Sequence, residues 1–434
     1  MWSYESVIYQ IYPLGLCGAP WENDGSVVPR ISHVAEWIPH IKKLGADAVY
    51  FCPMFDSDRH GYDTRDYTRL DPRLGTNEDM KKLCDELHEN GIRIVLDGVF
   101  NHVGRGYSAF QDVLRNRENS PYKDWFCGVN FGWNNCYNDG LSYEGWEGHN
   151  ELVKWNLRNE EVVQHILSAV GGWIEEFDID GLRLDVAYSL DMDFMRRLRQ
   201  FVDTKKADFW LVGEMIHGDY NRLLDEHNML HSVTNYQAYK GIWSSFNDMN
   251  MFEINHTLEQ HFCGMYRGKH LLNFVDNHDV NRLASTLKVK EHLPLVYGML
   301  YGIPGIPCIY YGSEWGIEGR KENGGDEALR PSLEKPQWNE LCDFIAKLSR
   351  VHKEEKALCY GDFCKLFLTN HQIVFARKFE NEKILVAINA SPDEFRANFN
   401  AGTERAVDLL TGEEIVFSGG ADLPGYSVAY WKCS

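Results

Sequence analysis

The chain has 434 residues, of which 44% are hydrophobic and 25% are charged, and its formal net charge at pH 7 is −20. These proportions are typical of a globular protein with a large core, and no apolar run is long enough to cross a membrane. The negative charge would repel nucleic-acid phosphates and anionic lipids. We therefore expect no nucleic-acid partner and no membrane, and we favour a neutral substrate.

The N-terminus and the cysteines bear on the cellular compartment. The first residues, MWSYESVIYQIYPLG, have no basic segment followed by an apolar one, so they do not resemble a secretion signal. The eleven cysteines form no C-x-x-C pair, and Cys52 and Cys308 fall within predicted core strands. We expect buried thiols and a reducing, cytoplasmic location.

Short β-rich runs alternate with helical patterns along most of the chain. The runs are VIYQIYP, DAVYFCP, RIVLDGVF, GLRLDVA, FWLVGEM, SVTNY, LLNFVDNHD and IPCIYYG. About eight strand–helix units predict an α/β fold, the closed parallel TIM (β/α)8 barrel. One helix is clearly marked: Thr76 or Asn77 can cap it, Gly91 can end it, and its apolar face contains Met80, Leu83, Cys84 and Leu87.

Two segments depart from this rhythm. Residues 103–154 show no strand–helix pair but many aromatic residues: Trp125, Phe126, Phe131, Trp133, Tyr137, Tyr143 and Trp146. We interpret them as a small inserted domain, whose aromatic side chains either form a local core or stack on sugar rings. Residues 353–434 alternate with a period of two between turns, which predicts a C-terminal antiparallel β-sandwich. The barrel would comprise residues 1–102 and 155–352.

Charged residues end four of the predicted strands, where the active site of a barrel lies. The third strand leads to Asp97, Asn101 and His102, the fourth to Arg183 and Asp185, the fifth to Glu214, and the seventh to His278 and Asp279. Arg183 and Asp185 alone could be a salt pair on a strand with one wet face. Several apolar strands that end in carboxylates instead indicate catalysis, because burying an ionised carboxylate is costly.

The acids at these strand ends have no metal-like spacing, and glycoside hydrolysis is the chemistry that fits them. One carboxylate would attack the anomeric carbon, and a second carboxyl group would protonate the leaving oxygen. Trp210 and Val212 lie on the same line of the fifth strand as Glu214, which predicts an apolar environment that raises the pKa of Glu214. Arg183 would favour the ionised form of Asp185.

Four segments, DGVFNH, GLRLDVA, GEM and FVDNHD, resemble in this order the four signature regions of the α-amylase family of glycoside hydrolases, family 13. HGYDTRDY and GIPCIYYGSE are further matches, so the resemblance covers the whole barrel. GLRLDVAYSL and YKDWF look most like the neopullulanase and cyclomaltodextrinase branch. Members of that branch usually have an additional N-terminal β-domain, whereas here the first barrel strand begins almost at Met1.

The resemblance implies a role for each matching residue. Asp185 would be the nucleophile, Glu214 the general acid/base and Asp279 the residue that stabilises the transition state. Further residues would bind the sugar: Tyr62 as a stacking platform, His102, Arg183 and His278 through hydroxyl groups, Asp97 behind Arg183, and Arg330 after the eighth strand. Each histidine alone would more often be structural, and Asp97 could be a plain buried ion pair.

The resemblance also bears on metal binding. Calcium-dependent members of the family commonly have Lys-His shortly after the nucleophile, where this chain has Tyr188 and Ser189. The inserted segment has no cluster of acids suited to a hard cation. We therefore expect no metal and no required cofactor, although Asn101 matches a residue that often binds calcium in the family.

The implied activity is that of a retaining hydrolase of α-1,4-glucosidic bonds in maltodextrins, cyclodextrins or starch fragments, with some tolerance of α-1,6 bonds. An exo-acting α-glucosidase or a transglycosylase of the same family is the nearest alternative. A non-catalytic glycan-binding or scaffold relative is a more distant one. The sequence does not determine chain-length preference, the ratio of linkages or the oligomeric state.

Overall fold

The core of the protein is a closed barrel of eight parallel strands. The computed structural model describes residues 1–322 and 325–434, and it orders the strands as β11-β10-β9-β5-β2-β1-β13-β12. A parallel bridge between Thr234 and Leu272 closes the barrel. The strands are β1 (Ile8–Ile11), β2 (Ala48–Phe51), β5 (Arg93–Gly98), β9 (Gly181–Leu184), β10 (Trp210–Gly213), β11 (Ser232–Val233), β12 (Leu272–Asn273) and β13 (Ile306–Tyr310). The predicted barrel is confirmed, with one strand in each predicted run.

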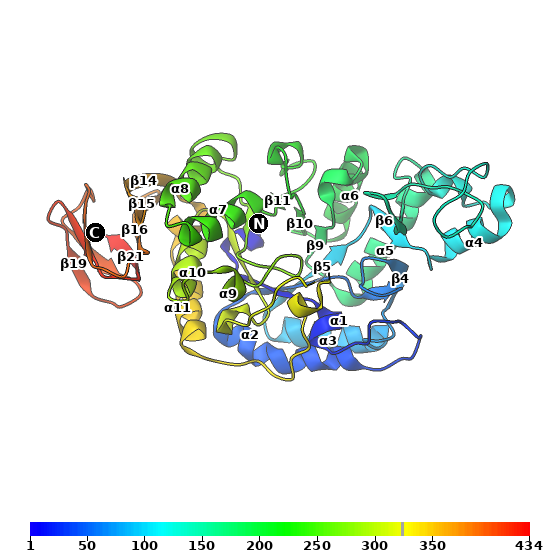
Figure 1. The fold of residues 1–434 in the computed structure, drawn as a ribbon, viewed down its shortest axis with the longest axis horizontal. Coiled ribbons are helices and arrows are strands. Elements are labelled where there is room, and N and C mark those ends of the chain that lie inside the picture. The colour runs from blue at the N-terminus through cyan, green and yellow to red at the C-terminus, as the bar shows by residue number, and fades with distance from the viewer. Residues whose placement is uncertain (323–324) are drawn as a thin grey trace.

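Helices surround the barrel (Figure 1). The longer ones are α2 (Ile38–Leu44), α3 (Asn77–Glu89), α5 (Glu160–Phe177), α6 (Met192–Lys205), α7 (Tyr236–Asn247), α8 (Met251–Gln260), α10 (His292–Gly302) and α11 (Glu340–Glu354). Short helices are α1 (Pro13–Leu16) and α9 (Leu283–Thr286), and a hairpin of β3 (Phe55–Ser57) and β4 (Thr64–Leu70) follows β2. Within the described residues, no helix combines the length and the apolar character that a membrane span requires.

Helix α3 illustrates how the sequence sets these elements. The Thr76 side chain accepts a hydrogen bond from the backbone N–H of Asp79, and the Asp79 side chain accepts one from the N–H of Thr76. The predicted apolar face is buried, with Met80, Leu83, Cys84 and Leu87. Beyond the helix, Gly91 adopts a φ of 73°, a left-handed conformation that favours glycine.

The inserted segment forms a lobe at one end of the molecule (Figure 1). Its antiparallel sheet has the order β6-β8-β7, built from β6 (His102–Gly104), β7 (Gly145–Trp146) and β8 (His149–Lys154), and α4 (Ser108–Asn116) follows β6. Phe126 and Tyr143 are buried and pack against Phe110, whereas Trp133 is 71% exposed. A local core therefore accounts for some of the aromatic residues of this segment but not for Trp133.

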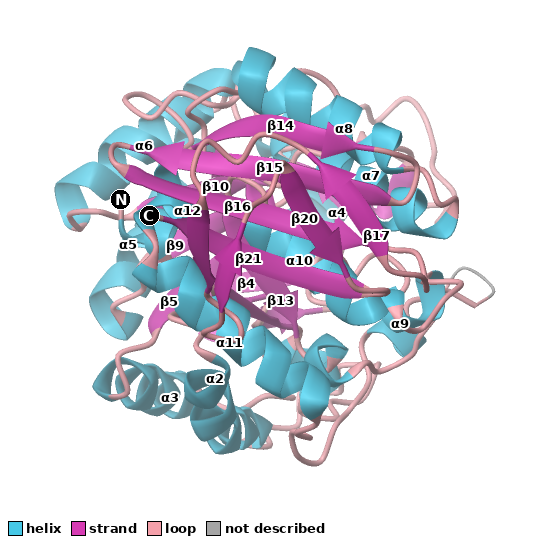
Figure 2. Ribbon diagram, turned by 90° about the vertical axis from the view of Figure 1, so that its left-hand side faces the viewer, coloured by secondary structure: helices cyan, strands magenta, loops and turns pink. Residues whose placement is uncertain are grey.

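The C-terminal part is an antiparallel β-sandwich, which faces the viewer in Figure 2. Its larger sheet has the order β14-β15-β16-β21-β18-β19, and its smaller sheet pairs β17 with β20. The strands are β14 (Asp362–Leu368), β15 (Gln372–Phe379), β16 (Glu382–Asn389), β17 (Phe395–Asn398), β18 (Arg405–Asp408), β19 (Glu414–Val416), β20 (Gly420–Leu423) and β21 (Ser427–Cys433). Val374 and Leu385 of the larger sheet and Ala397 and Leu423 of the smaller one share one apolar core.

A short helix lies between the barrel and the sandwich. Helix α12 (Lys356–Tyr360) follows α11, and its Ala357 and Leu358 are buried in the same apolar cluster as the barrel strands. The first strand of the sandwich begins at Asp362. The predicted border after residue 352 falls within the last turn of α11, and α12 lies between α11 and the first strand of the sandwich.

One buried arginine ties the sandwich to the barrel. Arg377 on β15 is fully buried, and its partners are backbone carbonyl oxygens rather than carboxylates. Its Nη1 donates to the carbonyl of Gly302, the last residue of α10, at 2.8 Å, and its Nη2 donates to Gly361 at 2.9 Å. The negative end of the α10 dipole favours this cation. Burial nevertheless lowers the pKa of Arg377 to about 10.

We expect Arg377→Met to lower the free energy of unfolding by about 2 to 4 kcal/mol, because the carbonyls of Gly302 and Gly361 would stay buried without a donor. Calorimetry should show a lower melting temperature for this variant than for the wild type. Arg396 of the same domain is a matched control, since its side chain is 41% exposed and pairs with Asp422 at the surface. Equal melting temperatures for Arg377→Met and Arg396→Met would contradict the expectation.

Candidate active site at the carboxyl ends of the barrel strands

Four charged residues meet where β5, β9 and β10 end. Asp97 on β5 is paired in register with Arg183 on β9, and Arg183 is paired with Val212 on β10. Asp185 and Glu214 follow β9 and β10 directly. Since neighbouring parallel strands are about 4.8 Å apart, this register brings the charged side chains to one height in the barrel. All four are at most 5% exposed.

Arg183 is the centre of this cluster. Its Nη1 lies 2.8 Å from Asp185 Oδ1 and 3.0 Å from both carboxylate oxygens of Asp97. Its Nη2 lies 2.8 Å from Glu214 Oε1. One guanidinium therefore contacts three buried carboxyl groups, which explains why a charged pair occupies the inner line of an otherwise apolar strand.

The cluster has more carboxyl groups than cations, and this excess shifts their pKa values. Burial raises the pKa of Glu214, Arg183 lowers it, and the charge of Asp279 raises it again, with a net increase as predicted. Burial also raises the pKa of Asp185, and Glu214 and Asp97 add to this against the effect of Arg183. As predicted, Arg183 favours the ionised form of Asp185, but burial and the other two carboxyl groups outweigh it, so that the pKa of Asp185 is raised on balance.

A second charged group lies across the barrel mouth, after β12 and β13. Asp279 Oδ2 is 3.0 Å from His278 Nε2, and Asp279 Oδ1 is 2.9 Å from Arg330 Nη2. Although burial raises the pKa of Asp279, the charges of His278 and Arg330 lower it well below its ordinary value. Burial lowers the pKa of His278, but the charge of Asp279 outweighs it and raises that pKa to about 10. Asp279 is thus ionised between two cations.

Tyr62 connects the two clusters. Its hydroxyl contacts His278 Nε2 and donates to Asp97 Oδ2 at 3.2 Å. Its ring lies nearly parallel to the imidazole of His278, with 5.6 Å between the ring centroids. The side chain therefore stands at the rim of the site, with one charged cluster on each side.

His102 faces the same space from β6. Asn101 donates to its Nδ1 at 3.1 Å, which leaves the proton on Nε2, and burial lowers the pKa of His102 to about 3. Nε2 has no hydrogen-bond partner among the described residues and lies 3.9 Å from Asp185 Oδ2. A neutral imidazole with a free N–H beside a carboxylate is suited to donate to a ligand oxygen.

The structure thus brings together all nine residues selected from the sequence, including Arg330. It adds four that the sequence analysis missed: Gln10, Tyr12, Tyr50 and Tyr236. Gln10 Nε2 is 2.8 Å from His278 Nδ1, and the Tyr50 hydroxyl donates to Asp97 at 2.8 Å. The ring of Tyr12 is 4.7 Å from the Arg330 guanidinium. The Tyr236 hydroxyl accepts from Asn277 at 3.1 Å and donates to Glu214 Oε1 at 3.4 Å.

The backbone is strained beside the acids. Val186 adopts φ 39° and ψ 47°, a left-handed conformation that is rare for a β-branched residue. Its N–H donates to Glu214 Oε2 at 3.0 Å, so the residue after Asp185 also positions Glu214. Strain of this kind persists where the surrounding structure enforces it, and it is frequent at active sites.

No metal centre is evident in the part of the chain that the structure describes. No group of three or more His, Cys, Asp or Glu residues there is arranged to hold a metal ion. The side chain of Asn101 is directed at His102 Nδ1.

Comparison with known proteins identifies the family. The α-amylase catalytic-domain model matches residues 22–356. A maltogenic α-amylase of Bacillus acidopullulyticus and a cyclomaltodextrinase of Thermoanaerobacter pseudethanolicus are each 31% identical; the matches cover 97% and 96% of this chain and 76% and 75% of those proteins. The ligand-free cyclic α-maltosyl-(1→6)-maltose hydrolase of Arthrobacter globiformis is 28% identical with a TM-score of 0.85, and each chain is covered completely. The chain therefore belongs to the α-amylase family of glycoside hydrolases, in the branch of the maltogenic amylases, cyclomaltodextrinases and neopullulanases.

Proposed function

We propose that the protein hydrolyses α-1,4-glucosidic bonds of maltodextrins with retention of anomeric configuration. One observation carries this proposal: Asp185 and Glu214 follow adjacent parallel strands in register, and both contact the guanidinium of Arg183 at 2.8 Å. Two carboxyl groups on adjacent strands, about 4.8 Å apart, suit the separation of about 5 Å in retaining glycosidases. An inverting enzyme needs roughly 6.5 to 9.5 Å to admit water between them.

The first step forms a covalent intermediate. Arg183 holds Oδ1 of Asp185, so Oδ2 is the oxygen left to attack the anomeric carbon. As the Oδ2–carbon bond forms, the bond from that carbon to the glycosidic oxygen breaks, and protonated Glu214 gives its proton to the leaving oxygen. The proton that Glu214 loses ends on the leaving oxygen, so this step needs no other acid. The raised pKa of Glu214 supports its role as the acid.

The second step releases the sugar. The Glu214 carboxylate takes a proton from a water molecule while the water oxygen attacks the anomeric carbon, and the bond to Asp185 breaks. Both carboxyl groups then return to their starting states. Attack from opposite faces in the two steps produces net retention.

Asp279 and its two cations serve the transition state. Because His278 and Arg330 keep it ionised, Asp279 places a negative charge near the positive charge that develops on the sugar ring. The same charge raises the pKa of Glu214, which helps the acid retain its proton. Tyr62 and His102 offer a ring face and a free N–H to that sugar.

The substrate class rests on the relatives. Their names refer to maltogenic amylase and cyclomaltodextrinase, which supports an α-glucan substrate for this chain. The Arthrobacter globiformis hydrolase, named for an α-1,6-linked cyclic maltose dimer, supports tolerance of α-1,6 bonds. The exo-acting α-glucosidase stays the alternative, and an end-blocked chromogenic maltoheptaoside distinguishes the two, because only an enzyme that cuts internal bonds degrades it.

Proton NMR of maltopentaose digestion tests the proposed mechanism. New reducing ends should appear first as the α-anomer, because two displacements retain the configuration. A fluorinated glycosyl donor should add one sugar to the wild-type protein in intact-mass analysis. Initial β-anomer would refute retention.

The matched variant is Asp185→Asn, which keeps the shape of the side chain but removes the nucleophilic carboxylate. It should lose roughly 6 kcal/mol or more of transition-state stabilisation, several orders of magnitude in rate, while still binding maltopentaose. The fluorinated donor should leave it unlabelled. Labelling that persists in Asp185→Asn would reject Asp185 as the nucleophile.

The hydrogen bond from Tyr236 to Glu214 predicts a shift in pH dependence. A hydroxyl that donates to a carboxylate stabilises its ionised form, so Tyr236→Phe should raise the pKa of Glu214. Because Glu214 must be protonated to act as an acid, the alkaline limb of the kcat/KM profile should move to higher pH. Tyr239→Phe, one turn further along α7, is the control. A limb that stays in place or moves to lower pH in Tyr236→Phe would contradict this role.

We further propose that activity does not require calcium. Excess EDTA should change the melting temperature and the rate of maltopentaose hydrolysis little. Magnesium and calcium should be added back separately to the treated protein. A loss of most activity that only calcium restores would show a cation site near Asn101.

A further inference from the structure

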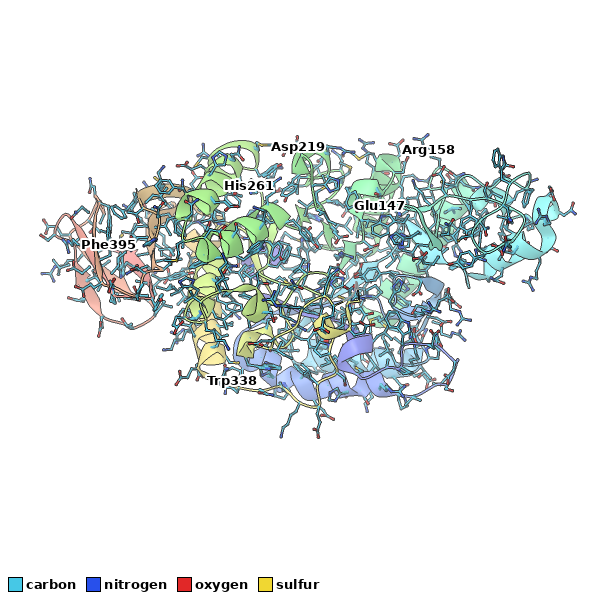
Figure 3. All side chains as sticks on the ribbon, viewed as in Figure 1. Glu147, Arg158, Asp219, His261, Trp338 and Phe395 are labelled. Atoms are coloured by element: carbon cyan, nitrogen blue, oxygen red, sulfur yellow. The ribbon has the colours of Figure 1, made fainter. Side chains whose placement is uncertain are left out.

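The tip of the β7–β8 hairpin reaches from the inserted lobe to the barrel. Glu147 and Gly148 form the turn with φ values of 47° and 86°, and the ring of Trp146 stacks on His149 with 5.6 Å between centroids. Across the gap, Tyr188 donates its hydroxyl hydrogen to Glu147 Oε1 at 3.3 Å (Figure 3 labels Glu147). The reaction steps derived above use neither Glu147 nor Tyr188.

Tyr188 and a second aromatic residue, His217, lie close in the chain to the reacting groups. Tyr188 comes three residues after Asp185, and His217 comes three residues after Glu214, on the loops that follow β9 and β10. Their rings contact each other, with 5.1 Å between centroids. Burial and the charges of Glu147 and Glu214 raise the pKa of Tyr188, which is consistent with a position beside the acid.

The site therefore has two sides. His278 and Arg330 follow strands β12 and β13, and together with Tyr62 they line one side. Tyr188 and His217 line the other, after β9 and β10. The sugar that is attacked lies against Tyr62 and His278, and Glu214 protonates the oxygen that leaves it. The leaving sugar must therefore depart on the side of Tyr188, where Glu147 and His217 are exposed to solvent.

We propose that Glu147, held by Tyr188, binds the leaving sugar of the substrate. Its carboxylate accepts hydrogen bonds from hydroxyl groups of a neutral glucosyl unit, and the rings of Tyr188 and His217 offer apolar faces to the same unit. This inference rests on the proposed function. If Glu147 binds a sugar at this position, the inserted lobe influences whether a second sugar or a water molecule occupies the site after the covalent step.

A second observation also directs the hairpin tip at a ligand. Trp146 Nε1 is buried and has no hydrogen-bond partner among the described residues. The Trp146 ring lies 5.9 Å from the ring of His102, whose Nε2 is likewise unpartnered. Trp146 ends β7 at the hairpin tip, and His102 begins strand β6 of the same sheet. A buried N–H donor without a partner is costly unless a ligand oxygen reaches it. The tip thus offers both an acceptor and a donor to sugar hydroxyl groups.

The experiment compares two substrates with different leaving groups. Maltopentaose leaves a sugar beside Glu147, whereas α-maltosyl fluoride leaves fluoride, which makes no contact with the hairpin. The measured quantity is kcat/KM for maltopentaose divided by kcat/KM for α-maltosyl fluoride. In Glu147→Ala this ratio should fall about tenfold, the effect of a lost hydrogen bond to a charged group.

Two further variants refine the test. Glu147→Gln should lower the ratio less than Glu147→Ala, because the amide oxygen still accepts from Tyr188. Tyr188→Phe should also lower it, since the phenyl ring remains but Glu147 is no longer held. Glu144→Ala is the matched control, because Glu144 precedes the same hairpin, is 58% exposed and pairs only loosely with Lys154 at 3.7 Å.

The outcomes are distinct. Equal losses on both substrates in Glu147→Ala would overturn the inference, because they indicate a purely structural hairpin. A ratio that stays at the wild-type value, or that falls as much in Glu144→Ala, would overturn it too. Wild-type protein that cleaves neither substrate would overturn the proposed function, and this inference with it.

Discussion

The site depends on one buried guanidinium. Arg183 lies within 2.8 to 3.0 Å of Asp97, Asp185 and Glu214, and the barrel walls bury all of these side chains. Three carboxyl groups could not be buried together without such a partner. Burial costs each ionised group roughly several kcal/mol of hydration free energy, and only a nearby opposite charge offsets this cost. The raised pKa values of Asp185 and Glu214 follow from the same imbalance between one cation and three carboxyl groups.

On the opposite side of the site, the buried carboxylate is balanced by more positive charge. There one carboxylate, Asp279, lies between two cations, His278 and Arg330, and it therefore stays ionised. Tyr62 bridges the two arrangements through contacts with Asp97 and His278. In the proposed mechanism, a sugar ring between them would have a proton donor, Glu214, on one side and the negative charge of Asp279 on the other. These are the two electrostatic conditions that cleavage of a glycosidic bond requires.

Much of this site could be predicted from the sequence, because polar residues at the ends of apolar strands are easy to recognise. The same argument, applied to inner positions of the first two strands, would have found Gln10 and Tyr50, which are neighbours in register. No sequence pattern pointed to Tyr236 as a site residue, because it begins a helix after a strand of only two residues. The pKa of Asp185 could not be predicted from its neighbour Arg183, because it depends on the two other carboxyl groups that the fold brings to that guanidinium.

The barrel is not equally stiff around its circumference. Strands β1, β2, β5, β9 and β10 are joined over four residues at each step, whereas β11 and β12 have two residues each and meet through a single bridge. Regions with few backbone hydrogen bonds open first. Asp185 and Glu214 follow the continuous half, while Tyr236 and Asp279 follow the seam. The two residues that we propose to make and break bonds therefore follow the more rigid part of the barrel, and the residues opposite them follow the part that opens more easily.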